Sequence, residues 1–152
     1  MSYLYFIGID VSKDSFHAAL HNSPSIQQFP NNKKGFSEFF ASLKHPTNQY
    51  FITLEATGGY ETNLLLFLCD KGFATHRLQT LKSAHYLRSL RVFGKNDVLD
   101  AQALARFGAE RHEHLPIFIS PTQDMQHLQT LRMRRDDLVR MRVSEKQRLK
   151  HP

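Results

Sequence analysis

Hydrophobic positions change their period along the chain, and these changes predict its elements. Three short runs near the start, at residues 4–9, 15–20 and 25–29, are rich in strand-forming residues and are separated by turn signals. Runs of this length and composition are typical of strands joined by tight connections. The first 30 residues are therefore expected to form a three-stranded antiparallel meander.

The pattern then alternates between helix and strand. Aromatic and leucine positions in KKGFSEFFASLK recur at steps of three and four, which predicts a helix over residues 33–44. A short apolar run at 49–56 predicts a buried strand, 58–72 a second helix closed by Gly72, and 73–78 a last strand. Strands that alternate with helices favour parallel pairing. We expect an α/β fold with a mixed five-stranded sheet and flanking helices.

Beyond the sheet the pattern is helical. Residues 83–93 and 96–110 predict two helices broken near Gly94, and Pro116 and Pro121 bracket a linker at 116–124. Leucine and methionine positions from Met125 onward predict one long amphipathic helix. The expected organisation is a catalytic domain at 1–115, the linker, and a basic helix at 125–152 that starts a coiled-coil region and pairs with a second copy.

Charge is concentrated in that last helix. The 152 residues have a formal net charge of +6, and the segment from Met125 to Pro152 holds eight Lys or Arg against three Asp or Glu. Such a surplus favours a polyanionic partner. Candidate nucleic-acid-binding residues of this helix are Arg132, Arg134, Arg135, Arg140, Arg142, Lys146 and Arg148.

The remaining composition limits the setting of the protein. Cys69 is the single cysteine, so no intramolecular disulfide can form and a reducing compartment is expected. The first residues carry no basic leader, and Asp10 interrupts their apolar run, so neither a signal peptide nor a membrane span is expected. We expect a cytoplasmic protein that has no membrane partner.

Acidic residues stand where two predicted strands end. Asp10 follows the apolar run YFIGI and Glu55 follows YFITL. The carboxyl ends of parallel strands open on one crevice. The stretch KNDVLDA adds Asp97 and Asp100, and helix positions three apart are neighbours. Asp10, Glu55, Asp97 and Asp100 are therefore the candidate catalytic and metal-binding residues.

Four carboxylates in one crevice require a cation, because mutual repulsion would otherwise raise their pKa values until protons bound. Carboxylate oxygens are the ligands that Mg²⁺ prefers, and Mn²⁺ accepts them too. Two such ions would clamp the attacking and leaving oxygens of a phosphodiester displacement. Lys13, beside Asp10, and Lys95, before Asp97, are further candidate phosphate contacts.

Each acid also has a structural alternative. Asp10 fits a turn acid, and its surroundings also resemble the first phosphate loop of actin-like sugar kinases. Glu55 fits an acid near a helix start, and the Asp97 and Asp100 pair fits a solvated helix face. Tyr60 is expected to pack against the sheet rather than to stack on a base. The run from His112 to His114 lacks the spacing of a helical zinc pair.

The motifs GIDVSK, LEATGGY and KNDVLDA, in this order and at these separations, resemble the signatures of the DEDD transposases, insertion-sequence recombinases related to the Piv DNA invertase. The resemblance covers nearly the whole chain. It implies a RuvC-like, ribonuclease-H-type fold in which Asp10, Glu55, Asp97 and Asp100 bind Mg²⁺ for DNA cleavage and strand transfer.

The resemblance also implies partners. Members of this family carry a C-terminal domain with a serine nucleophile, which these 152 residues lack, so this chain alone is expected not to complete recombination. A structured guide RNA joins DNA as an expected partner. Two other functions remain open: an endonuclease that cleaves Holliday junctions, and a nucleic-acid-binding module without catalysis.

Overall fold

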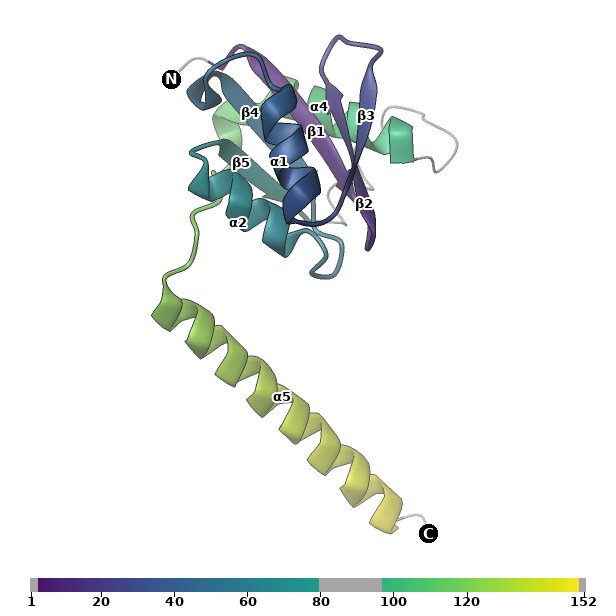
Figure 1. Cartoon of the computed structure of the whole chain (residues 1–152). Helices are drawn as coiled ribbons and strands as arrows, with labels where there is room; N and C mark the ends of the chain where they lie inside the picture. The colour runs from purple at the N-terminus through teal and green to yellow at the C-terminus, as the bar shows by residue number, and fades with distance from the viewer. Residues whose placement is uncertain (1–2, 80–96, 151–152) are drawn as a thin grey trace. The chain divides into compact units, whose positions relative to one another are not determined.

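The computed structural model describes residues 3–79 and 97–150. The helix expected at 83–93, its break near Gly94 and the candidate Lys95 lie outside the described residues. The chain divides into two compact units, Met1–Phe118 and Ile119–Pro152. Figure 1 shows the first as a sheet with helices and the second as one long helix.

The first unit contains the expected mixed sheet. Its strands are β1 (Tyr5–Val11), β2 (Ser15–Leu20), β3 (Ile26–Pro30), β4 (Tyr50–Glu55) and β5 (Ala74–Leu78), in the order β3-β2-β1-β4-β5. Strands β1, β2 and β3 pair antiparallel, whereas β4 pairs parallel with both β1 and β5. The meander and the parallel strands are thus confirmed.

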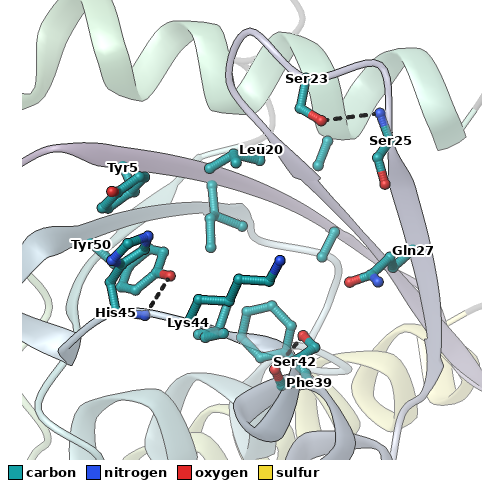
Figure 2. Close-up of a pocket in the computed structure, with 14 residues that line it drawn as sticks. Tyr5, Leu20, Ser23, Ser25, Gln27, Phe39, Ser42, Lys44, His45 and Tyr50 are labelled. Atoms are coloured by element: carbon teal, nitrogen blue, oxygen red, sulfur yellow. Dashed lines mark hydrogen bonds between the residues drawn. The ribbon is translucent and has the colours of Figure 1, made fainter.

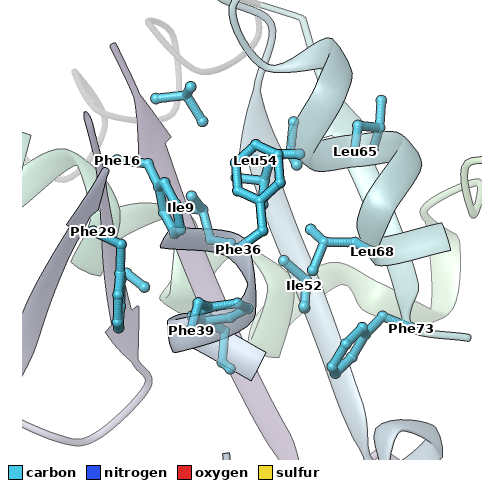
Figure 3. Packing of buried hydrophobic residues seen from close by; sticks show 14 of the residues in the cluster. Ile9, Phe16, Phe29, Phe36, Phe39, Ile52, Leu54, Leu65, Leu68 and Phe73 are labelled. Carbon is cyan, nitrogen blue, oxygen red and sulfur yellow. The ribbon is translucent and has the colours of Figure 1, made fainter. Parts of the chain in front are cut away.

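Helices cover both faces of this sheet. On one face lie α1 (Lys33–Ser42) and α2 (Thr62–Asp70), and on the other lies α4 (Asp97–Arg111). Alternate residues of β1 and β4 divide between the two layers, because successive strand residues point to opposite faces. Ile9, Ile52 and Leu54 belong to the core under α1 and α2 (Figure 3). The neighbours Gly8 and Thr53 therefore face α4.

Local chemistry sets the helix starts. Asn32 caps α1, since its side chain accepts hydrogen bonds from the backbone N–H of Lys34 and Gly35. The helix expected over 58–72 begins only at Thr62. Gly58 (φ 75°) and Gly59 (φ 112°) adopt left-handed conformations, which a right-handed helix cannot include. Residues 58–61 therefore form a turn between β4 and α2.

Two short helical turns and the segment after α4 complete the unit. The turns are η1 (Thr47–Gln49) and η2 (His112–His114). The start of the predicted linker is held against β5, since the Phe118 N–H donates to the Thr75 carbonyl at 2.6 Å and the Pro116 carbonyl lies 2.8 Å from His76 Nδ1. This segment covers the outer edge of β5, an arrangement that blocks pairing with another strand.

The second unit is the helix α5 (Gln123–Lys150), which confirms the long C-terminal helix. In the part of the chain that the structure describes, no helix has the length and apolarity needed to cross a membrane. Successive residues of an α-helix are rotated by about 100° around its axis. On this basis four exposed leucines of α5 lie within about 80° of arc and form one stripe: Leu128, Leu131, Leu138 and Leu149. The basic side chains lie on all sides of the helix.

Candidate active site

The two strand-end acids lie on neighbouring strands. The register pairs Ile9 of β1 with Leu54 of β4, so Asp10 and Glu55 follow side by side at the carboxyl ends of parallel strands. Adjacent strands are about 4.8 Å apart. Both acids are half-buried, and alternation along each strand places them on the face that α4 covers. The spatial meeting of these two positions, predicted from the sequence, is present.

Helix α4 reaches this face through an unusually close contact with β1. A Cβ atom added at Gly8 would lie 2.0 Å from the Ala101 carbonyl oxygen and 2.2 Å from the Ala105 nitrogen. Only a glycine allows the two backbones to approach in this way. Asp100 directly precedes Ala101 and is half-buried. The contact at Gly8 thus places the first turns of α4 over the part of β1 that leads to Asp10.

The other end of α4 fixes its direction across the sheet. Gly108 lies over β4, where an added Cβ would be 2.5 Å from Thr53 Oγ1. Farther on, the His112 ring lies 4.9 Å from the Phe6 ring and 5.9 Å from the Phe51 ring, centroid to centroid. The helix therefore runs obliquely from the carboxyl half of β1 toward the amino ends of β1 and β4. Asp97 and Asp100 belong to the end nearer the strand acids.

The carboxylates are not gathered into a complete metal site among the described side chains. Within that set, no three His, Cys, Asp or Glu residues form a group that could hold a metal ion. The backbone of Asp97 begins α4, but its side chain is outside the described set. The donor chemistry of Asp10, Glu55 and Asp100 suits a hard cation. These residues therefore fit a metal site by their chemical type and by their positions on the strands and on α4.

His17 is a neighbour of Asp10 that the sequence did not predict. The antiparallel register of β1 and β2 pairs Asp10 with His17, and directly opposed residues in a sheet lie on the same face. A histidine in a strand carries no sequence signal for this position. Only the register of the two strands places an imidazole beside the acid.

The turn after Glu55 is built around a buried carboxylate that the sequence did not single out. Glu61 is fully buried, and its Oε2 accepts hydrogen bonds from Gly59 N at 2.9 Å, Thr57 N at 3.1 Å and Thr57 Oγ1 at 3.3 Å. Its Oε1 accepts from Nε of Arg77 at 3.0 Å and from a second guanidinium nitrogen. These bonds fix the turn of residues 57–60 directly beyond Glu55.

The electrostatics of Glu61 follow from these contacts. Burial raises the pKa of this carboxyl, but hydrogen bonds from its own backbone N–H, Arg77, Gly59 and Thr57 lower it by more, so the pKa lies below its usual value of 4.5. The carboxyl is therefore ionised at neutral pH, where it binds the Arg77 guanidinium. The sequence signal is faint: an acid at the end of a glycine turn, just before an apolar helix.

Two other predicted residues have defined surroundings. Tyr60 is 52% exposed, so the expectation that it packs against the sheet is wrong. The left-handed glycines before it turn the chain outward and carry its ring into solvent. Lys13 is exposed in the turn after β1, two residues past Val11. Both residues border the strand-end acids along the chain.

His112 of η2 packs in the fold and is not part of this site. His112 lies among the rings of Tyr3, Phe6 and Phe51, and its Nδ1 lies 3.3 Å from the Ala109 carbonyl oxygen. Aromatic contacts at 5–6 Å between centroids are typical of protein cores. His112 therefore secures the end of α4 to β1 and β4.

A cavity of about 300 Å³ lies elsewhere in the first unit, at the amino ends of β1 and β4 and on the side of α1 (Figure 2). The Lys44 side chain lies along it, and the ring of His45 stacks on that of Tyr5 at 4.2 Å. The candidate acids occupy the opposite edge and the opposite face of the sheet. This cavity is separate from the candidate active site.

Known proteins share these features. A family model described as a transposase, for DEDD transposases of the IS110 type, matches residues 7–151. The pilin gene-inverting proteins of Moraxella lacunata and Moraxella bovis are each 29% identical to this chain over 148 residues, which is 94% of the chain and 45% of the relative. The chain thus spans under half the length of these relatives.

A solved structure is also similar. The Thermus thermophilus RuvC structure covers 76% of this chain and 100% of its own, with 10% sequence identity and a TM-score of 0.47. The family model extends over nearly all of the chain, including the three motifs that carry Asp10, Glu55, Asp97 and Asp100. The resemblance stated from those motifs is confirmed, and the chain belongs to the DEDD transposase family.

Proposed function

We propose that this chain is the metal-binding domain of a DNA recombinase that acts in strand cleavage and transfer. The observation that carries the proposal is the position of Asp10 and Glu55 at adjacent strand ends, on the face crossed by α4. Two neighbouring carboxylates are most stable as anions when a cation lies between them. The DEDD transposase family and its DNA-inverting relatives favour DNA as the substrate.

Asp10, Glu55, Asp97 and Asp100 would hold Mg²⁺ or Mn²⁺ at this edge of the sheet. An ion bound there would polarise a phosphodiester oxygen and neutralise charge that develops during displacement. The chain's own residues supply the setting. The close contact at Gly8 positions α4, the Glu61 network fixes the turn after Glu55, and the exposed Lys13 attracts phosphate toward the strand ends.

The metal site is tested by thermal unfolding of the wild type and of Asp10→Asn during Mn²⁺ titration. A ligand that binds only the folded state adds about 2.7 kcal/mol at 100 times its Kd. We expect a rise in Tm with metal for the wild type and little rise for Asp10→Asn.

Asp70→Asn is the matched control, since Asp70 is an exposed acid at the end of α2. Its metal response should equal that of the wild type. An equal response in Asp10→Asn and Asp70→Asn would show that the ion binds elsewhere. Cleavage of branched DNA by these 152 residues alone, dependent on Asp10, would instead favour a Holliday-junction endonuclease.

We further propose that α5 binds the phosphates of DNA and of a structured guide RNA, and that its leucine stripe pairs with a second copy. Ion pairs on α5 engage Arg135, Arg140 and Arg148 with acids of the same helix. Such exposed pairs are weak and exchange readily for phosphate contacts. Arg135 and Arg142 lie within the leucine stripe, so pairing of two copies would gain from anions bound between them.

Replacing Arg132, Arg134 and Arg142 together by glutamine should flatten the salt dependence of nucleic-acid binding. The slope of log K against log salt is negative, and each lost phosphate contact reduces its magnitude by about 0.9 for duplex DNA and about 0.7 for single strands. Fluorescence anisotropy from low to moderate salt measures the slope for DNA and for RNA. The triple arginine-to-lysine variant keeps the charge and should keep the slope. An unchanged slope in the glutamine variant contradicts the role of α5.

A further inference from the structure

Asn31 links three loops near the carboxyl ends of β1 and β4, where Asp10 and Glu55 lie: the β3–α1 connection, the β1–β2 turn and the β4–α2 turn. It lies between β3 and α1, and its backbone N–H donates to the Asp14 carbonyl at 3.0 Å. Its side-chain Nδ2 donates to the Ser12 carbonyl at 2.9 Å and to the Tyr60 carbonyl at 3.1 Å. These partners are 19 and 29 residues away along the chain. One amide therefore ties two distant turns together.

Each of these two turns follows an acid-bearing strand. Ser12 comes two residues after Asp10, just past the end of β1, and Tyr60 lies in the turn that follows Glu55 at the end of β4. The Glu61 carboxylate braces the second turn from within, through Gly59 and Thr57. Asn31 adds the connection between that turn and the β1–β2 turn.

The orientation of the amide is fixed by its partners. Both acceptors of Nδ2 are carbonyl oxygens, so an exchanged amide would set Oδ1 against two other oxygens. The Oδ1 atom is buried and has no hydrogen-bond partner among the described residues. Both donated bonds of Nδ2 therefore depend on this one orientation of the amide.

We propose that Asn31 is a positioning residue, which sets the distance between the Asp10 and Glu55 carboxylates and thereby the metal affinity and selectivity of the site. This inference rests on the proposed metal-binding function. Mg²⁺ demands near-ideal octahedral geometry, whereas Ca²⁺ accepts irregular ligand sets. Loss of the two bonds would let the strand ends shift, and Mg²⁺ affinity would fall by more than Ca²⁺ affinity.

Calorimetric titration of Mg²⁺ and of Ca²⁺ into the wild type, Asn31→Ala and Asn31→Asp tests the proposal. Residues that hydrogen-bond metal ligands directly contribute about 10- to 100-fold in affinity, and Asn31 acts one step farther out, through the backbone carbonyls of Ser12 and Tyr60. We expect a loss of up to about 10-fold for Mg²⁺ in both variants and a smaller loss for Ca²⁺. Asn31→Asp keeps the size of the side chain but turns two donors into acceptors that face carbonyl oxygens.

Two controls separate positioning from general destabilisation. Ile7→Val trims the core on the opposite face of β1, lowers Tm and should leave the Mg²⁺ to Ca²⁺ affinity ratio unchanged. Asn63→Ala removes an exposed amide at the start of α2 and should bind metal as the wild type does. Should Asn31→Ala fail to fold, Asn31→Ser decides by the same titration.

The outcomes distinguish this inference from the function on which it rests. If the wild type binds neither ion, or if Asp10→Asn binds as tightly as the wild type, the proposed metal site is wrong. If the wild type binds in an Asp10-dependent way while Asn31→Ala and Asn31→Asp keep its affinities and their ratio, Asn31 has no positioning role. A selective loss of Mg²⁺ affinity in the Asn31 variants supports it.

Discussion

Replacing Glu61 by alanine is expected to lower the free energy of unfolding by about 1–3 kcal/mol, the usual cost of leaving buried hydrogen-bond donors without their acceptor. The carboxylate is fully buried and binds the backbone of residues 57 and 59 together with the Arg77 guanidinium. Its removal leaves these donors without their acceptor and frees the turn after Glu55. Urea unfolding of the two proteins measures the difference.

The same carboxyl should make stability depend on pH. Hydrogen bonds hold the pKa of Glu61 in the folded protein below its usual value of 4.5, which the unfolded chain restores. A group with a lowered folded pKa stabilises fully above its unfolded pKa, and this contribution disappears as the pH falls through the folded pKa. As the pH is lowered below about 4.5, the free energy of unfolding of the wild type should therefore decrease more steeply than that of Glu61→Gln.

Glu38→Gln is the control for both measurements. Glu38 is an exposed partner of Lys34 at 3.8 Å, and such surface pairs contribute about 0–1 kcal/mol. This variant should follow the wild type in urea and in acid. If Glu61→Ala were no less stable than Glu38→Gln, the buried network would not hold the turn.

Gly8→Ala is expected to destabilise the protein by 3 kcal/mol or more, at or above the upper end of the usual range of about 1–3 kcal/mol for overpacking. The added methyl group would lie 2.0 Å from the Ala101 carbonyl oxygen, a backbone atom that no rotamer change can move. Helix α4 must therefore shift from β1. The variant should also lose most of the Mn²⁺-dependent rise in Tm.

Gly58→Ala is the matched substitution in open space. No atom lies within 4 Å of a Cβ built there, but the backbone is left-handed at φ 75°. Its cost is expected to be about 1–2 kcal/mol from the backbone alone, without displacement of α4. Equal losses of stability and of metal response in Gly8→Ala and Gly58→Ala would refute the role of the close contact at Gly8.

Periodicity along the sequence determined the elements and their order. Alternating and continuous apolar runs identified the strands because burial on one or both faces of a sheet imposes these patterns. Helical spacing in KKGFSEFFASLK identified α1, and the strand–helix–strand succession predicted the parallel pairing of β1, β4 and β5. The placement of Asp10 and Glu55 at neighbouring strand ends followed from the same succession.

Two predictions from the sequence, the start of α2 and the linker at Pro116, differ from the structure because of backbone conformation and backbone hydrogen bonds. The apolar run of α2 continues from a stretch that reads as helix, yet Gly58 and Gly59 hold a left-handed turn. As a result α2 starts at Thr62, and Tyr60 is exposed rather than packed. Likewise the segment between Pro116 and Phe118 reads as linker, but its backbone hydrogen-bonds along β5.

Tertiary structure alone decided which polar groups support the candidate site. Asn31 donates to carbonyl oxygens 19 and 29 residues away along the chain. Glu61 binds Arg77, which lies 16 residues later. Gly8 contacts a helix that begins almost 90 residues later. A local sequence pattern shows which face of an element is buried, because buried residues recur about every 3.6 positions in a helix and every second position in a strand. It carries no record of which distant backbone atom a single side chain meets, because that depends on strand register and helix approach in the folded protein.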